Sequence, residues 1–393
     1  MKSVVLFSLL GLCTLAFGQS ASDSFNLNQN SVYQRPFIQS STSRTAVGGY
    51  LEGNTNYMYE DGVAEGFSME LRRFNIFLYS SISRNIKFLS ELEFEHGTEE
   101  IALETAMLDF KLHQQIRFRA GIILPTIGIF NSNHDAPNWE FVERPISSTL
   151  IIPSTLSEVG FGIDGYFPTS KLMIGYQVFA TNGLGDDIVQ NSLGRTDLNS
   201  GKREQMFGED NNGLPMYNAH ISLSNYKGSE VGFSYYGGVY NTFQADGLDI
   251  DSKRKLSLWS LDFDVSIKKI NVKGEYVWTS IDVPSPSLPM YGTKQQGGFV
   301  DLIYPVYQNK ILRFSKAVVN ASLRVEYFDL NDNLIGDGEV AGEQGSRISL
   351  GLGLRPVPGT LIRANYMWAQ QNDILSNPMI RSGGYQIGVA SYF

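Results

Sequence analysis

Apolar and polar residues alternate along most of the chain between Ala46 and Phe393. In residues 319–327, Val, Ala, Leu, Val and Tyr alternate with Asn, Ser, Arg and Glu, and residues 347–355 repeat the same period of two. This period places apolar side chains on one face of a strand and polar side chains on the other. About sixteen such segments follow one another, each near the roughly 9 to 11 residues of a tilted membrane strand. The pattern predicts an all-β fold, a transmembrane antiparallel β-barrel of about 16 strands.

The connections between these segments alternate between short and long. Short turns belong on the periplasmic side of such a barrel and long loops on the extracellular side, with both termini in the periplasm. The short turns are predicted at residues 83–85, 113–115 and 356–359, and the long loops at residues 125–156, 183–214, 284–292 and 331–344. A soluble β-sandwich shares the alternation, so the number and length of the segments, without a linker between them, decide for the barrel.

The first residues have the features of a secretory signal. Lys2 precedes an apolar run that ends at Phe17, and Ala16 and Gly18 stand where a small-residue cleavage site is expected. An anchoring helix, or a lipoprotein signal at Cys13, is the alternative. We expect a cleaved signal peptide at residues 1–18, a flexible periplasmic segment rich in Ser, Asn and Gln at residues 19–45, and the barrel at residues 46–393.

Composition narrows the possible functions. Cys13 is the single cysteine, so a mature chain has neither a disulfide nor a thiolate metal site. The chain carries 31 Lys and Arg against 40 Asp and Glu, a net charge of −9, which argues against nucleic-acid binding. No run of 18 apolar residues follows the signal, and the chain ends in an amphipathic segment closed by Phe393. These features predict the outer membrane of a Gram-negative bacterium, with membrane lipid and lipopolysaccharide as partners.

Several motifs in the first half resemble the phosphate-selective porin O and P family. They are Gly48-Gly49-Tyr50-Leu51-Glu52, Arg72-Arg73-Phe74, the run from Arg117 to Ile122 followed by Pro125 and Gly128, the segment from Asn138 to Pro145, and Glu158-Val159-Gly160-Phe161-Gly162. The resemblance implies a sixteen-stranded porin, commonly a homotrimer, in which the loop at residues 125–156 folds into the lumen. An ordinary solvated loop is the alternative. Small residues at Ala46, Gly48, Ala64 and Ser391 are candidates for a face between subunits.

Charged residues on the polar faces are the candidate channel lining. They comprise wall residues and residues of the 125–156 loop, namely Arg117, Arg119, Glu91, Glu93, Arg324, Arg347, Asp135, Glu140, Glu143 and Arg144. Two hypotheses exist for Arg117 and Arg119. They either face the loop carboxylates across a constriction, where charges set the electrostatic barrier, or pair with Asp109 or Glu93 on neighbouring strands. Acidic and basic residues share the inner face, so we expect weak net selectivity rather than a phosphate-specific arginine ladder.

Catalytic and metal-site motifs are absent from the sequence. Only four histidines occur, and neither a G-x-S-x-G nor an H-E-x-x-H motif is present. The acidic loop at residues 183–214 lacks the spacing of an EF-hand and is expected to be solvated. We therefore predict no enzyme, no cofactor and no metal. The predicted function is a porin for passive diffusion of ions and small polar solutes, including phosphate-type anions. A plugged barrel acting as an adhesin or scaffold, or an outer-membrane hydrolase, is the alternative.

Overall fold

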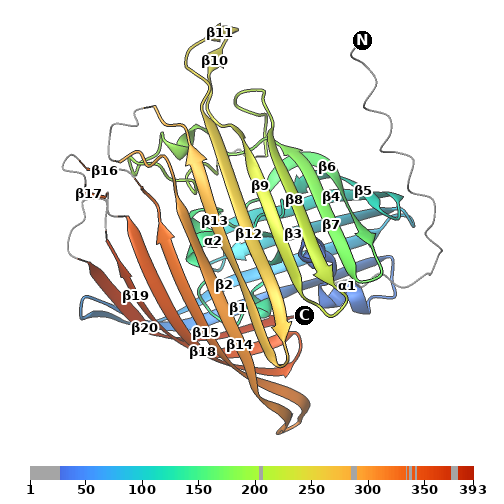
Figure 1. Cartoon of the computed structure of the whole chain (residues 1–393). Coiled ribbons are helices and arrows are strands. Elements are labelled where there is room, and N and C mark those ends of the chain that lie inside the picture. The colour runs from blue at the N-terminus through green and yellow to red at the C-terminus, as the bar shows by residue number, and fades with distance from the viewer. Residues whose placement is uncertain are drawn as a thin grey trace.

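The computed structural model is a closed antiparallel β-barrel of sixteen strands (Figure 1). It describes residues 27–202, 207–284, 290–332, 334–335, 339–340, 343–372 and 379–393. The predicted signal peptide lies outside the described residues. The barrel strands are β1 (Thr45–Glu60), β2 (Val63–Ser81), β3 (Ile86–Glu95), β4 (Glu100–His113), β5 (Ile116–Ile123), β6 (Glu158–Pro168), β7 (Leu172–Thr181), β8 (Met216–Asn225), β9 (Glu230–Val239), β12 (Lys255–Ile267), β13 (Ile270–Ile281), β14 (Gln296–Ile311), β15 (Phe314–Asp329), β18 (Gln344–Val357), β19 (Thr360–Gln371) and β20 (Ile380–Tyr392).

Each barrel strand pairs with its sequence neighbours in the barrel, and β1 pairs with β20 to close it. Closure satisfies the backbone groups of the two terminal strands, for example through the pairing of Tyr50 with Tyr392. The predicted strand number and antiparallel arrangement are therefore confirmed. The strands vary from 8 residues in β5 to 19 in β2, so several exceed the expected length.

At one end of the barrel every connection is a short turn, and the long connections lie at the other end, together with the short β1–β2 and β3–β4 turns. We call these the short-turn end and the long-loop end. Two small hairpins belong to long connections: β10 (Gln244–Ala245) with β11 (Leu248–Asp249), which projects above the barrel in Figure 1, and β16 (Leu334–Ile335) with β17 (Glu339–Val340). In the part of the chain that the structure describes, no helix has both the length and the hydrophobicity to cross a membrane.

Alternation along the strands divides the wall into two faces. In β8, every second residue from Met216 to Ser224 is buried while those between are exposed. The exposed members are largely apolar, such as Ile221 and Leu223, and the buried members include polar side chains such as Asn218. In β8 the inward face is thus mainly polar and the outward face mainly apolar, the reverse of a strand in a soluble β-sandwich.

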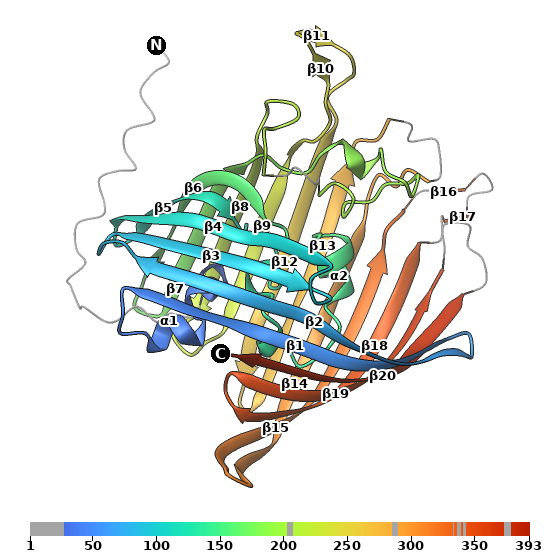
Figure 2. The same cartoon turned by 180° about the vertical axis from the view of Figure 1, so that it is seen from behind.

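Two non-strand segments lie inside the barrel. The first contains η1 (Asn28–Tyr33) and α1 (Pro36–Ser40); we call residues 27–40 the N-terminal segment. The second is the connection between β5 and β6, with η2 (Asn131–Asn133), η3 (Ala136–Asn138) and α2 (Ile146–Leu150); we call residues 124–157 the inner loop. A further short helix, η4 (Asp186–Ile188), lies in the connection between β7 and β8. Figure 2 shows α1 near the short-turn end and α2 farther toward the long loops.

The N-terminal segment corrects one expectation. Residues 27–40 were expected to belong to a flexible periplasmic lead-in, but the structure orders them against the inner wall. Leu27, Gln29, Val32 and Arg35 are all buried. The polar composition that suggested solvation also suits a polar lumen, because the wall supplies hydrogen-bond partners for the segment.

Candidate functional site

The inner loop crosses the lumen and is held by arginines of the opposite wall. Arg324 on β15 donates to the carbonyl oxygen of Glu143 at 2.8 Å, and Arg347 on β18 donates to that of Arg144 at 2.8 Å. Arg363 on β19 donates to the carbonyl oxygens of Trp139 and Phe141 at 2.6 and 2.7 Å. A loop that leaves the wall at β5 is thereby fixed to strands on the far side of the barrel. The expected insertion of residues 125–156 into the lumen is confirmed.

Backbone and aromatic packing direct the loop inward. Gly128 has a φ of +64°, and a Cβ there would lie 2.2 Å from Oε2 of Glu275, so a larger residue would be strained at this position. Beyond this turn, Trp139 packs on Phe130 with ring centroids 4.9 Å apart and on Phe299 of β14 at 6.0 Å. Lys273 places its ammonium 3.7 Å from the centroid of the Trp139 ring, a cation–π contact. This apolar cluster, and a larger one in which Ile127, Ile151 and Ile152 pack against wall residues, anchor the loop inside the barrel.

Arg35 connects the N-terminal segment to both the loop and the wall. Its guanidinium donates to both carboxylate oxygens of Asp135 at 2.8 Å and to Glu91 on β3 at 2.6 Å, and it lies 3.5 Å from the ring centroid of Phe77. The side chain is 2% exposed. Burial would lower the pKa of Arg35, but Asp135 and Glu91 outweigh it and raise the pKa. The guanidinium therefore remains charged in its buried position.

Arg117 and Arg119 do not face the loop carboxylates, which corrects the expected constriction. Arg117 forms an ion pair with Asp164 on β6, and Arg119 lies 3.2 Å from Asp164 and 3.4 Å from Asp109 on β4. Asn30 of the N-terminal segment also accepts a hydrogen bond from each arginine. Of the two hypotheses, the structure supports pairing with neighbouring strands. Both arginines lie toward the short-turn end of β5, whereas the loop leaves β5 from the opposite end.

The three loop carboxylates bind other cations. Asp135 binds Arg35, as described above. Glu140 accepts a hydrogen bond from Arg355 of β18 at 2.8 Å. Glu143 lies 2.9 Å from Arg72 of β2. Burial alone would raise the pKa of Glu143, but Arg72 outweighs it and lowers the pKa to about 2. These pairs attach the loop to the wall on several sides rather than setting up a field opposite Arg117 and Arg119.

The other predicted site residues also lie inside the barrel. Glu91 and Glu93 are buried on β3, where Asn75 of β2 donates to both, at 2.7 and 2.8 Å. Arg324 pairs with Asp301 at 2.6 Å, and Arg347 pairs with Glu326. The structure thus places every predicted site residue in the interior but brings most of them into compensated pairs.

A cavity of about 870 Å³ lies between the inner loop and β2–β4, toward the long-loop end; we call it the vestibule. Charges of both signs line it. The carboxylates are Glu93, Glu95, Glu100 and Glu104, and the cations are Arg73, Arg144 and Lys202. Burial lowers the pKa of Lys202, an effect that the nearby Glu104 opposes. The vestibule is the largest of the cavities described here.

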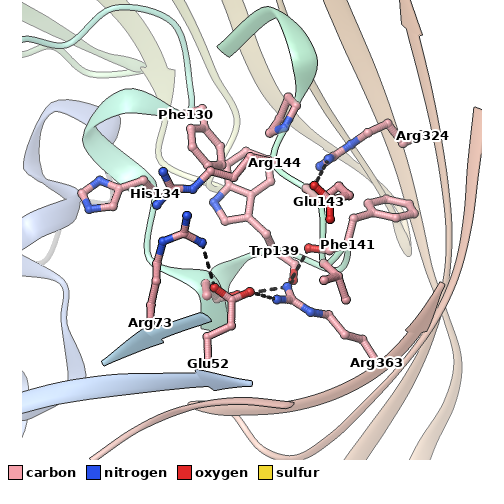
Figure 3. Close-up of a pocket in the computed structure, with 13 residues that line it drawn as sticks. Glu52, Arg73, Phe130, His134, Trp139, Phe141, Glu143, Arg144, Arg324 and Arg363 are labelled. Atoms are coloured by element: carbon pink, nitrogen blue, oxygen red, sulfur yellow. Dashed lines mark hydrogen bonds and ion pairs between the residues drawn. The ribbon is translucent and has the colours of Figure 1, made fainter. Parts of the chain in front are cut away.

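Figure 3 shows a smaller pocket of about 10 Å³. It shares the lining residues Arg73 and Arg144 with the vestibule. Glu52 lies on its floor, bonded to Arg73 at 3.0 Å and paired with Arg363. This volume is near that of a single water molecule. A third cavity of about 180 Å³ lies toward the short-turn end and shares no lining residue with the vestibule; we call it the lower cavity. The inner loop and the N-terminal segment therefore narrow the lumen between the two ends.

Among the residues that the structure describes, one group of side chains has metal-ligand spacing. Atoms of Glu91, His134 and Asp135 lie within 4.8 Å of one another. The guanidinium of Arg35 already binds both carboxylates, so a cation at this point would meet a fixed positive charge. Burial would lower the pKa of His134, but Glu91 and Asp135 outweigh it and raise the pKa. The cluster fits an ion-pair network better than a metal site.

One histidine has a serine partner. Nδ1 of His220 on β8 lies 2.9 Å from Oγ of Ser234 on β9, and both side chains are buried. A histidine hydrogen-bonded to a serine hydroxyl also occurs in the catalytic triad of serine hydrolases. Both residues are almost inaccessible, at 3% and 0% exposure, which disfavours a role as a nucleophile and its base.

Sequence reasoning missed several interior residues. Arg35 lies in a segment that was read as solvated, and Asp164 was overlooked although it alternates in phase with the inner face of its strand. Glu104 and Lys202 of the vestibule were also missed. The alternation along the strand places Asp164 on the inner face, whereas its pairing with Arg117 follows from the β5–β6 register.

The architecture matches known structures at low sequence identity. The chain is similar to Salmonella typhi OmpF, solved in complex with daunomycin, with a TM-score of 0.55 and 11% identity, covering 89% of this chain and 98% of that one. It is also similar to an anion-selective porin from Comamonas acidovorans, with a TM-score of 0.54 and 11% identity, covering 89% of this chain and 99% of that one. The fold is that of outer-membrane porins. At this identity, the likeness establishes the fold alone.

Sequence comparison is less informative. No protein-family model matches the chain, so the resemblance to the phosphate-selective O and P family stays a prediction. A protein of Aquifex aeolicus (strain VF5), described only as uncharacterized, is 34% identical over 146 residues. The match covers 35% of this chain and 32% of that protein, so the chain spans about a third of the relative's length.

Proposed function

We propose that the protein is an outer-membrane porin through which ions and small polar solutes diffuse passively. The observation that carries this proposal is the closed sixteen-stranded barrel with a charged interior. A barrel of about eight strands is filled by its own side chains, whereas one of about sixteen encloses more space than its wall side chains fill. Here the inner loop and the N-terminal segment occupy part of that space, and the vestibule remains.

The outer surface supports a location in the outer membrane. Exposed wall residues such as Leu350 and Leu352 form an apolar exterior that water would not solvate favourably. Exposed aromatics lie near both ends of the strands, the usual positions of interfacial girdles. Those near the long-loop end include Tyr217, Trp278, Tyr327 and Trp368, and those near the short-turn end include Phe167, Tyr226, Phe314 and Phe393.

The vestibule indicates which solutes would pass. Cations and carboxylates line it together, so a solute of either charge meets an attractive partner, and neither charge dominates. The pairing of Arg117 and Arg119 with Asp109 and Asp164 further reduces any anion preference. The proposed cargo is therefore small zwitterions and neutral polar solutes, with phosphate-type anions passing without special preference.

A swelling assay with proteoliposomes tests this proposal. Vesicles that contain the refolded protein are diluted into isotonic solutions of neutral, zwitterionic and anionic solutes of increasing size. We expect swelling that falls steeply with solute size and differs little among glycine, glycerol and phosphate. Swelling no faster than in protein-free vesicles would contradict the porin function. A strong preference for phosphate would restore the phosphate-selective interpretation.

A plugged barrel that acts as an adhesin or scaffold is the second candidate. The observation in its favour is that the vestibule and the lower cavity share no lining residue. Removal of residues 27–40 distinguishes the two candidates: a narrowed porin gains permeability, whereas a barrel sealed by the inner loop stays closed. A hydrolase is a third candidate, based only on the pair His220 and Ser234.

The proposed partners are membrane lipid, lipopolysaccharide and two further copies of the chain. The trimer rests on the family resemblance, and the candidate small residues need correction. Gly48 is buried, and a Cβ there would lie 2.4 Å from Cγ of Phe37, so it faces the N-terminal segment. Ala46 shares that inward face of β1, while Val47 is exposed. Native mass spectrometry in detergent is expected to show trimers, and monomers alone would end this proposal.

A further inference from the structure

The lower cavity has an excess of negative charge. Its lining contains Glu230 from β9 and Asp262 and Asp264 from β12, and it contains no lysine or arginine. Neutral residues of the N-terminal segment and the inner loop complete it, among them Asn28 and Asn133. Glu230 and Asp264 are paired in the β9–β12 register, so their Cβ atoms are about 5 Å apart. Three carboxylates thus share one cavity without a balancing cation in its lining.

The carboxylate oxygens of this cavity are incompletely bonded. Asp262 is 2% exposed, yet its Oδ2 atom has no hydrogen-bond partner among the described residues. Glu230 accepts a hydrogen bond from the backbone N–H of Asn28 at 3.0 Å through Oε2, while its Oε1 atom has no such partner. A buried carboxylate oxygen without a partner is costly, because it has lost its bonds to water.

The lysine on the neighbouring strand β13 is directed elsewhere. Lys273 pairs with Asp264 in the β12–β13 register, but its ammonium donates to the carbonyl oxygen of Asn138 and lies over the ring of Trp139. Asp264 itself accepts a hydrogen bond from the side-chain amide of Asn271 at 2.5 Å. Among the described residues, neither Asp262 nor Glu230 forms an ion pair with a lysine or arginine, and each keeps a carboxylate oxygen without a hydrogen-bond partner.

We propose that the lower cavity binds one hard divalent cation, Ca²⁺ or Mg²⁺, through Asp262 and Glu230, with water completing its coordination. Carboxylate oxygens suit hard cations. The cavity volume of about 180 Å³ accommodates an ion together with several water molecules. The cation also stabilises the seated N-terminal segment, because Asn28 of that segment is bonded to Glu230. The site does not depend on whether the barrel conducts.

Manganese binding tests the site directly, since Mn²⁺ accepts the same oxygen ligands and is detected by electron paramagnetic resonance. The full mature chain, refolded in detergent without lipopolysaccharide, is titrated with MnCl₂ at pH 7.5. We expect one saturable site per chain that Ca²⁺ or Mg²⁺ displaces. Asp262→Asn and Glu230→Gln, which preserve side-chain shape, are each expected to weaken binding by at least about tenfold, since even the loss of a residue that hydrogen-bonds to a metal ligand costs about 10- to 100-fold.

Asp246→Asn is the matched control, because Asp246 is exposed in the β10–β11 hairpin at the opposite end of the barrel. It should leave Mn²⁺ binding unchanged, and heat-modifiable migration on gels verifies that each variant is folded. Absence of a saturable site in the wild type, or equal binding by the wild type and Asp262→Asn, would overturn the proposal. Neither result bears on the swelling assay, so failure of this site and failure of the porin function are distinguishable.

Discussion

Replacement of Arg35 by alanine is expected to release the N-terminal segment from the lumen. The side chain makes charge-assisted hydrogen bonds to Asp135 and Glu91 while almost fully buried. Removing one partner of a buried ion pair costs about 3–5 kcal/mol, because the remaining charges stay desolvated. A tenfold change in an equilibrium corresponds to about 1.4 kcal/mol, so the population with the segment displaced should rise by roughly two to four orders of magnitude.

Cysteine labelling measures this displacement. Val32 is buried beside Leu89 and Met107, and the predicted mature chain contains no other cysteine, so Val32→Cys reacts with a polar maleimide only when the segment leaves the wall. Its labelling rate should increase with the displaced population when Arg35→Ala is added. Arg84→Ala is the control, since Arg84 is exposed in the turn between β2 and β3. A rate in the Arg35→Ala background within about tenfold of the control would refute the assigned role of Arg35.

Four further outcomes follow from the same contacts. The pKa of Glu143 is lowered from 4.5 to about 2, so the stability that this carboxylate contributes is complete above pH 4.5 and is lost as the pH falls toward 2. Glu143→Gln should abolish this part of the acid unfolding transition, which is measured by tryptophan fluorescence. Trp139→Ala should destabilise the inner loop by about 3–5 kcal/mol, measured as faster limited proteolysis within residues 124–157. Gly128→Ala should loosen the same loop, because φ is positive there and a Cβ collides with a wall carboxylate; an unchanged proteolysis rate would count against this. The wild type should be nearly unselective, and the double variant Arg117→Ala with Arg119→Ala should show the reversal potential of a cation-selective channel in a salt gradient. A strongly anion-selective wild type would contradict the account.

The strands were predictable because their environment is periodic. Residues 319–327 and 347–355 lie in β15 and β18, and their apolar members face outward as the two-residue period requires. The three predicted short turns lie at one end of the barrel and the four predicted long loops at the other. The position and the outward face of each strand can be predicted from its own residues, because a barrel strand requires only its own alternation and one neighbouring strand on either side.

The partners inside the lumen were not predictable in the same way. The period of two placed Arg117 on the inner face but did not reveal whether Asp164 or a loop carboxylate would bind it, because that choice depends on strand register and on the path of the inner loop. Arg35 was missed for a different reason. A segment rich in Ser, Asn and Gln is soluble in water and equally able to bond to a polar wall, so composition does not separate the two states.

Single-channel recording in a planar bilayer tests the central claim most directly. The full mature chain, refolded and added to one side of the membrane, is predicted to produce stepwise increases in current. The steps should be smaller than those of a variant that lacks residues 27–40, because the N-terminal segment narrows the lumen. Absence of steps from both the wild type and the truncated variant, with both verified as folded, would contradict the assignment as a porin and favour the plugged scaffold.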